Sequence, residues 1–129
     1  MAGLVQDLPR IHPGTRTAVS EQSFVYVHVE LQTNQTPLVV RIWPTTYLID
    51  CGSPHRSTLV HAENISYAPW WTPVPQRAKF CFLLVFTGLP AGCTRFDLVE
   101  ETNSGEGGAF VVRNIARNET DVYKLFLDF

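Results

Sequence analysis

Residues 24–31 read FVYVHVEL, and in this stretch valine or leucine occupies every second position. Successive side chains of a β-strand point to opposite faces, and β-branched residues favour extended backbone. The alternation therefore predicts a half-buried strand rather than a helix. The side chains expected on its core face are Val25, Val27, Val29 and Leu31.

Similar segments follow along the chain, separated by turns that contain Gly, Pro, Asn or Ser. Residues 78–87 are apolar on both faces, which is typical of a central strand. Turn signals recur about every 8–12 residues, the spacing expected for a β-sandwich or barrel. The expected strands are residues 24–31, 37–43, 45–51, 56–63, 78–87, 94–100, 109–116 and 122–129.

These segments predict one all-β domain, an immunoglobulin-like and mostly antiparallel β-sandwich of about eight strands. The length of 129 residues fits a single domain. A hydrophobic content of 45% excludes an intrinsically disordered chain. We expect the sandwich to occupy residues 16–129 and an irregular N-terminal arm to occupy residues 1–15.

The net charge of the chain and the lengths of its apolar runs limit the kinds of partner that we expect the protein to bind. The formal net charge of −2 argues against a protein that binds nucleic acid through phosphates. No apolar run approaches the ~18 residues of a membrane helix, so no membrane insertion is expected. The first residues, MAGLVQDLPR, lack the pattern of a signal peptide, which predicts a cytoplasmic protein or a part of a larger assembly.

The chain contains three cysteines, Cys51, Cys81 and Cys93, and no CxxC motif. Three thiols cannot all pair within one chain. The prediction is a reduced protein, and one disulfide with one free thiol is the alternative.

Metal binding is the first chemistry to consider. Cys51, His55 and His61 are spaced C-x3-H-x5-H, which matches no standard zinc module and leaves no evident fourth ligand. His61 shares a strand face with Leu59, so we expect His61 in a buried or rim position. The sequence therefore predicts no metal site and no cofactor.

Catalytic motifs are also missing from the sequence, which has no GxSxG elbow and no P-loop. The Gly-rich residues 102–108 lack the Lys-Ser/Thr pair of a phosphate loop, so an ordinary hairpin loop is expected. Asp97 and Glu100 differ by three positions and point to opposite faces of a strand, unlike a glycosidase carboxylate pair. We expect them to cap a turn or to pair with an arginine. The protein is predicted not to be an enzyme, with a minor activity of Cys51 and His55 as the remaining alternative.

The segment of residues 64–79 is the most informative for function. It contains three prolines and the pair Trp70-Trp71, so it cannot form a central strand. Aromatic residues on a Pro-stiffened loop are typical of interaction hot spots, and the candidate binding residues are Tyr67, Trp70 and Trp71. The alternative interpretation is that one tryptophan covers an open end of the core.

The last expected strand, residues 122–129, places Tyr123, Leu125, Leu127 and Phe129 on one face. An apolar strand at this position requires a cover, which is either the core or another subunit. We expect this strand to be structural.

Residues 46–100 resemble a poorly characterised bacterial family of β-sandwich accessory domains. The resemblance rests on TYLID at residues 46–50, FLLVFTGLPAG at residues 82–92 and FDLVE at residues 96–100. It implies an immunoglobulin-like sandwich and a non-catalytic accessory module, often in envelope or exported proteins. The family has no established catalytic residues, so the resemblance assigns none here.

The absence of a catalytic constellation and the excess of aromatic residues favour a non-catalytic interaction or structural module. Such a module is expected to be a subunit of a larger protein assembly, through a protein partner or self-assembly. The alternative function is a small-ligand or glycan-binding domain that uses the Pro/Trp loop of residues 64–79.

Overall fold

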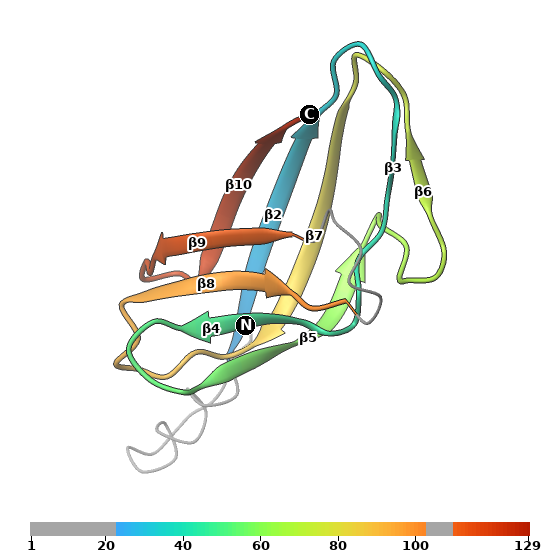
Figure 1. Cartoon of the computed structure of the whole chain (residues 1–129). Coiled ribbons are helices and arrows are strands. Elements are labelled where there is room, and N and C mark those ends of the chain that lie inside the picture. Colours follow the sequence, from blue (N-terminus) through green and yellow to red (C-terminus); the bar gives the residue numbers. More distant parts are fainter. Residues whose placement is uncertain (1–22, 103–109) are drawn as a thin grey trace, which may run out of the picture.

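The computed structural model describes residues 23–102 and 110–129 (Figure 1). The predicted N-terminal arm and most of the Gly-rich loop lie outside these residues. The described chain is all-β, which confirms the predicted fold class, and none of it forms a helix suited to crossing a membrane. Its nine strands are β2 (Phe24–Gln32), β3 (Leu38–Val40), β4 (Thr46–Asp50), β5 (Arg56–Glu63), β6 (Thr72–Val74), β7 (Lys79–Thr87), β8 (Arg95–Glu100), β9 (Val111–Ala116) and β10 (Val122–Asp128).

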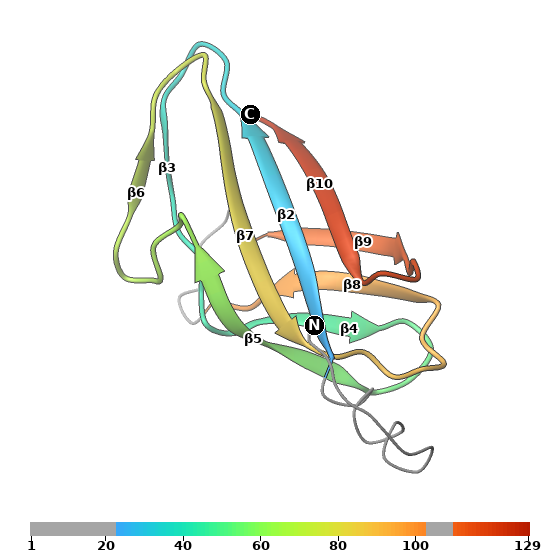
Figure 2. The same ribbon diagram turned by 180° about the vertical axis from the view of Figure 1, so that it is seen from behind.

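Seven of the described strands form one sheet in the order β10-β2-β7-β5-β4-β8-β9, and β3 pairs with β6 in a separate two-stranded ribbon. The large sheet folds back on itself, so that β4, β8 and β9 run across β10, β2 and β7 as a second layer (Figures 1 and 2). β5 connects the layers, because it pairs with β4 and with β7 and its register shifts between Leu59 and His61. Such an irregularity bends a strand and lets it pass from one layer to the next.

The hydrophobic core lies between the two layers. All four predicted core residues of β2 are buried, which confirms the alternation seen in the sequence. Phe82, Leu84 and Phe86 of β7 are buried beside them. The ring of Phe96 in β8 packs edge-on against Tyr123, with ring centroids 5.0 Å apart. Full burial of such side chains stabilises the fold by about 1.5–3 kcal/mol each.

The last strand, β10, pairs with β2 in parallel, whereas the other strand pairs of the described residues are antiparallel. Tyr123 is buried, and Leu125 and Leu127 pack against the core, so the predicted structural face of this strand is confirmed. Phe129 was expected on the same face. It is exposed, because β10 ends at Asp128 and Phe129 lies past the end of the strand.

The segment between β2 and β4 differs from the prediction of a strand over residues 37–43. Only Leu38–Val40 forms a strand, because the prolines that flank this segment cannot donate to a ladder. Ile42 forms an isolated bridge with Tyr67 instead. The partner of β3 is β6, a three-residue strand within the Pro/Trp loop. A two-stranded ribbon tolerates Pro73 because both of its strands are edges.

His61 is exposed, so its predicted buried or rim position is wrong. The prediction assumed that residue parity is constant along β5. The register shift between Leu59 and His61 breaks this parity, and Ala62 packs against the core in place of His61.

Candidate functional site

The Pro/Trp loop is fixed by backbone hydrogen bonds to the segment that follows β3. The Ile42 N–H donates to the Ser66 carbonyl (2.8 Å), and the Ala68 N–H donates to the Ile42 carbonyl (2.9 Å). Within the loop, the Ser66 N–H donates to the Thr72 hydroxyl (3.0 Å). These bonds hold the backbone on both sides of the tryptophan pair, so the loop presents its aromatic residues from a defined frame.

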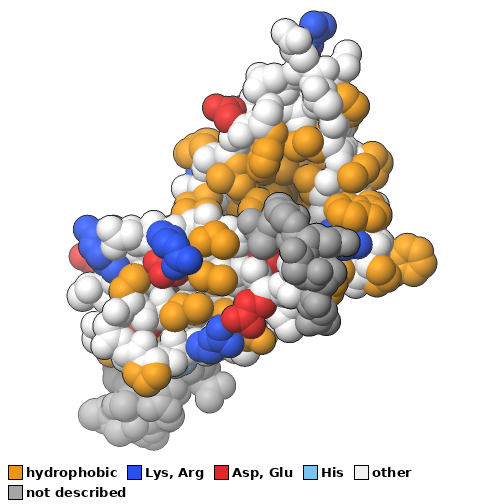
Figure 3. All heavy atoms as spheres, viewed as in Figure 1, with side chains coloured by type: hydrophobic (Ala, Val, Ile, Leu, Met, Phe, Trp, Pro, Cys, Tyr) orange, Lys and Arg blue, Asp and Glu red, His pale blue; other side chains and the backbone are white. Residues whose placement is uncertain are grey.

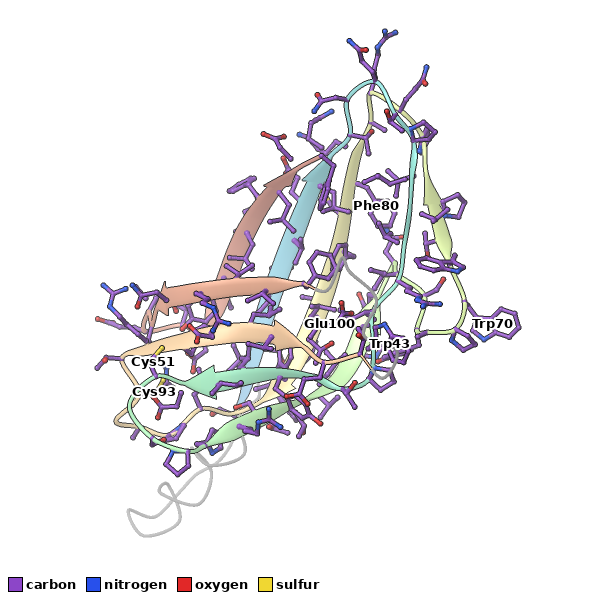
Figure 4. The ribbon with its side chains drawn as sticks, in the orientation of Figure 1. Trp43, Cys51, Trp70, Phe80, Cys93 and Glu100 are labelled. Carbon is purple, nitrogen blue, oxygen red and sulfur yellow. The ribbon has the colours of Figure 1, made fainter. Side chains whose placement is uncertain are left out.

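All three predicted binding residues of this loop are exposed. Trp70 is 73% exposed, Trp71 is 51% exposed, and Tyr67 is exposed to a smaller extent. Figure 4 shows Trp70 pointing away from the body of the protein. The alternative that a tryptophan covers the core is therefore wrong. The aliphatic residues Ile42 and Ile65 occupy the core in this region.

Arg41 links two tryptophans in a stack. Its guanidinium carbon lies 3.9 Å from the ring centroid of Trp71 and 5.2 Å from that of Trp43. Nη1 of Arg41 also donates to the carbonyl of Pro69 (3.1 Å). Cation–π contacts contribute about 0.5–2 kcal/mol each, so the stack orients Trp71 in the free protein. We call Arg41, Trp43, Tyr67, Trp70 and Trp71 the aromatic surface.

An apolar groove lies beside this stack, between β3, the start of β9 and the end of β10. Its volume is about 360 Å³, and Trp71 forms part of its wall. Figure 3 shows hydrophobic side chains gathered in the hollow between β3 and the layer of β10, β2 and β7. Trp70 and Tyr67 are not among its lining residues. The predicted binding residues are therefore divided between a groove wall and an outward-facing surface.

Glu100 is the acidic residue in the groove lining, and it is only 6% exposed. Its Oε2 accepts the backbone N–H of Trp43 (2.9 Å), and its Oε1 accepts the backbone N–H of Phe110 (3.0 Å). Burial raises the pKa of Glu100 above its ordinary value, although these two donors and Arg41 act in the opposite direction. The prediction for Glu100 was a turn cap or an arginine pair; its hydrogen-bond partners are instead the backbone N–H groups of two other segments.

A second polar cluster lies at the turn between β4 and β5, near the labelled Cys51 and Cys93 in Figure 4. The Asp50 carboxylate accepts the Gly52 N–H (2.9 Å) and the Ser53 hydroxyl (2.7 Å), and these bonds hold the pKa of Asp50 below its ordinary value. Burial raises the pKa of Cys93 to about 11. This cluster fixes a turn and keeps its buried thiol protonated.

The enzymatic alternative of Cys51 with His55 gains no support from the geometry. Sγ of Cys51 lies 3.5 Å from Asp97 Oδ1, and His55 Nε2 lies 3.0 Å from Ser57 Oγ. Partial desolvation and the Asp97 carboxylate raise the pKa of Cys51, although its side chain is exposed, and this is the opposite of what activates a thiol nucleophile. Asp97 also pairs with Arg113 (3.2 Å), as expected for a structural carboxylate.

Potential metal ligands are dispersed over the part of the chain that the structure describes, where no three His, Cys, Asp or Glu side chains are arranged around a common point. His61, a member of the C-x3-H-x5-H spacing, contacts Glu63 (3.1 Å). The three cysteines are free thiols, as in the predicted reduced protein.

Sequence reasoning missed the contribution of Arg41 and Trp43 to the aromatic surface. Their spacing of two residues placed both on one face of an extended segment, which was an available signal. The contact with Trp71 could not be anticipated, because it depends on the bridge between Ile42 and Tyr67.

Comparison with known proteins identifies no relative: no family model, curated protein or solved structure matches the chain.

Proposed function

We propose that the protein is a non-catalytic interaction module, a subunit of a larger assembly, and that the aromatic surface binds a protein partner. The observation that carries this proposal is the exposure of Trp70, which is 73% exposed on a loop with a fixed backbone. Tryptophan is enriched among hot-spot residues, because one rigid ring buries a large apolar area on contact. The resemblance of residues 46–100 to accessory β-sandwich domains agrees with this proposal.

The polar groups of the groove favour a protein partner over a sugar. Sugar recognition requires several free hydrogen-bonding groups beside an aromatic face. Of the three polar groove residues Arg41, Glu100 and Thr102, Glu100 already accepts backbone N–H groups with both carboxylate oxygens, and the Arg41 guanidinium lies over the rings of Trp43 and Trp71. An apolar side chain of a partner protein suits such a wall better than a sugar hydroxyl does. Trp70 would then insert into the partner while the groove receives a side chain from it.

The test compares the wild-type protein with Trp70→Ala and with Val60→Ala as a matched control. Val60 is also an exposed apolar residue, but it lies on β5. Proteins captured from native lysate are identified by quantitative mass spectrometry, and the affinity for the purified partner is then measured by calorimetry. Trp70→Ala is expected to weaken binding by more than about 1 kcal/mol, which is roughly fivefold, while Val60→Ala leaves it unchanged.

Equal affinity of the Trp70→Ala and Val60→Ala proteins for the partner would refute the proposed surface. The competing function, a small-ligand or glycan-binding domain, has its own signature on a glycan array. Binding to a defined sugar that is lost in Trp71→Ala and retained in Trp70→Ala would favour the groove as a ligand site, because only Trp71 of the two lines it.

A further inference from the structure

Among residues 23–102 and 110–129, no strand pairs with the outer edge of β10. Within the described residues, β10 has one strand neighbour, β2, and it lies at the end of the strand order. The Tyr26 N–H donates to the carbonyl of Asp121 (2.9 Å), and the Phe129 N–H donates to the carbonyl of Gln32 (3.0 Å). In a parallel ladder, alternate residues direct both backbone groups to the same neighbour. The odd-numbered residues of β10 therefore bond to β2, and the even-numbered ones direct their N–H and C=O groups to the open edge.

The side chains of the same even-numbered residues lie on the outer face of the sheet. Phe126 is 65% exposed, and the charged residues Lys124 and Asp128 flank it two positions away on either side. The Lys124 ammonium lies 5.8 Å from the Phe126 ring centroid, within cation–π range. Natural edge strands are usually blunted by a proline, a bulge, a cover or charged side chains, because their open backbone groups pair readily with another strand. β10 carries one charge of each sign, Lys124 and Asp128, which repel a copy in some registers and attract it in another. β10 contains no proline, and its register with β2 is unbroken.

We propose that β10 pairs antiparallel with β10 of a second copy of the chain, around a two-fold axis at Phe126. In this register the two Phe126 rings face each other, and each Lys124 lies opposite Asp128 of the other copy. All of these pairs use residues whose backbone groups point to the open edge, so ladder hydrogen bonds and side-chain contacts require the same alignment. The result is an isologous dimer in which the two large sheets become continuous.

Charge complementarity selects this register among those that the backbone allows. An axis at Lys124 would place two lysines opposite each other, and an axis at Asp128 would oppose two carboxylates, both of which are unfavourable. An axis at Leu125 would leave Lys124 opposite Phe126 and would form no ion pair. The sequence lysine–phenylalanine–aspartate at alternate positions is complementary to itself only when Phe126 lies on the axis.

This inference goes beyond the proposed function, because Lys124, Phe126 and Asp128 do not line the groove, and the exposed Trp70 lies on another element. Trp70→Ala is expected to leave the dimer intact, and a β10 variant is expected to keep affinity for a partner of the aromatic surface. Failure of one proposal is therefore distinguishable from failure of the other.

The first experiment is a charge exchange, followed by sedimentation equilibrium over a wide range of protein concentration. Lys124→Asp and Asp128→Lys each convert two attractive contacts into repulsive ones, and each is expected to lower the association constant by roughly tenfold. The double variant exchanges the charges and is expected to restore association to nearly the wild-type level. All of these side chains are exposed, so we expect every variant to keep the wild-type fold. Circular dichroism checks this expectation.

The second experiment tests the register by disulfide formation in a background that lacks the exposed thiols, Cys51→Ser with Cys81→Ser. Hydrogen-bonded antiparallel partners have Cα atoms about 5.5 Å apart, which is within disulfide range. Phe126→Cys is therefore expected to form a covalent dimer under mild oxidation. Lys124→Cys alone is the matched control and is expected to form no disulfide-linked dimer, whereas its mixture with Asp128→Cys cross-links.

Either of two results would overturn the proposal. One is a wild-type protein that sediments as a monomer at every concentration. The other is a charge-exchanged double variant that associates no better than the single variants, together with equal cross-linking of Phe126→Cys and Lys124→Cys.

Discussion

Glu100 offers a sharp test of how the aromatic surface is held to the sandwich. Its carboxylate accepts the N–H groups of Trp43 and Phe110, and it lies at the end of β8 in a buried position. Glu100→Ala removes both acceptors. Each buried donor that loses its partner costs about 1–3 kcal/mol, so we expect the free energy of unfolding to fall by about 2–6 kcal/mol. This is a large fraction of the ~5–15 kcal/mol of a typical domain.

The amide variant Glu100→Gln separates hydrogen bonding from charge. Its oxygen can accept one of the two N–H groups, so we expect a loss of about 1–3 kcal/mol. Because burial raises the pKa of Glu100 in the folded state, the folded protein prefers the protonated carboxyl. Its contribution to stability is therefore fully present below the unfolded pKa and is lost as the pH rises through the folded pKa. The difference in stability between the wild type and Glu100→Gln should then shrink as the pH rises above 4.5, the ordinary pKa of a glutamate.

Urea unfolding, followed by circular dichroism at a series of pH values, measures both effects. The matched control is Glu101→Ala, because Glu101 is the next carboxylate along the chain, is exposed, and forms an ion pair with Arg56. Exposed pairs of this kind contribute at most about 1 kcal/mol. Equal stability of Glu100→Ala and Glu101→Ala would refute the role of Glu100, and a wild-type advantage over Glu100→Gln that grows with pH would refute the sign of its pKa shift.

Two further predictions concern the core and the thiols. Tyr123→Phe should lower the free energy of unfolding in urea by about 1–2 kcal/mol, because the buried hydroxyl donates to Asp121 (2.9 Å) and accepts a backbone N–H (3.0 Å). A loss confined to a few tenths of a kcal/mol would show that water replaces both bonds. Thiol titration should label the exposed Cys51 and Cys81 in the native protein, whereas Cys93, with its pKa raised to about 11, should react only on unfolding. Rapid labelling of all three would contradict the buried position of Cys93.

The local alternation of apolar and polar residues was sufficient to predict most strands of this fold. The expected strand of residues 56–63 matches β5, and that of residues 24–31 ends one residue before β2 does. Half-buried strands leave a period of two in the sequence, and a strand paired on both sides, such as β7, leaves a continuous apolar run. These signals are local, so a single sequence contains them.

Other features of the fold depend on contacts between distant segments. β6 has three residues and a proline at its centre, and it forms only because β3 lies beside it. The exposure of His61 depends on the register shift within β5, which arises where this strand turns from one layer into the other. The parallel pairing of β10 with β2 joins strands far apart in the chain, and no property of either strand alone indicates its direction.

The candidate site likewise has features that the local sequence indicates and features that depend on contacts between distant segments. The composition of the Pro/Trp loop identified Trp70 and Trp71 as noteworthy, but composition is the same for a loop that covers a core and for one that faces solvent. The distinction depends on Ile42 and Ile65, which fill the core beneath the loop. The burial of Glu100 was compatible with its predicted strand face, whereas its two backbone partners were not predictable.

The parallel pairing of β2 with β10 determines how the domain would respond to mechanical force. The two strands run in the same direction, so tension applied at Phe24 and at Asp128 pulls them past each other along their length. The seven residues of β10 are matched one for one with β2, and the load is therefore shared by the whole ladder. Rupture in shear requires these hydrogen bonds to break together, whereas strands that are peeled apart lose them one at a time. The first and last strands of the described chain thus form a clamp that makes the sandwich resistant to stretching between these two points.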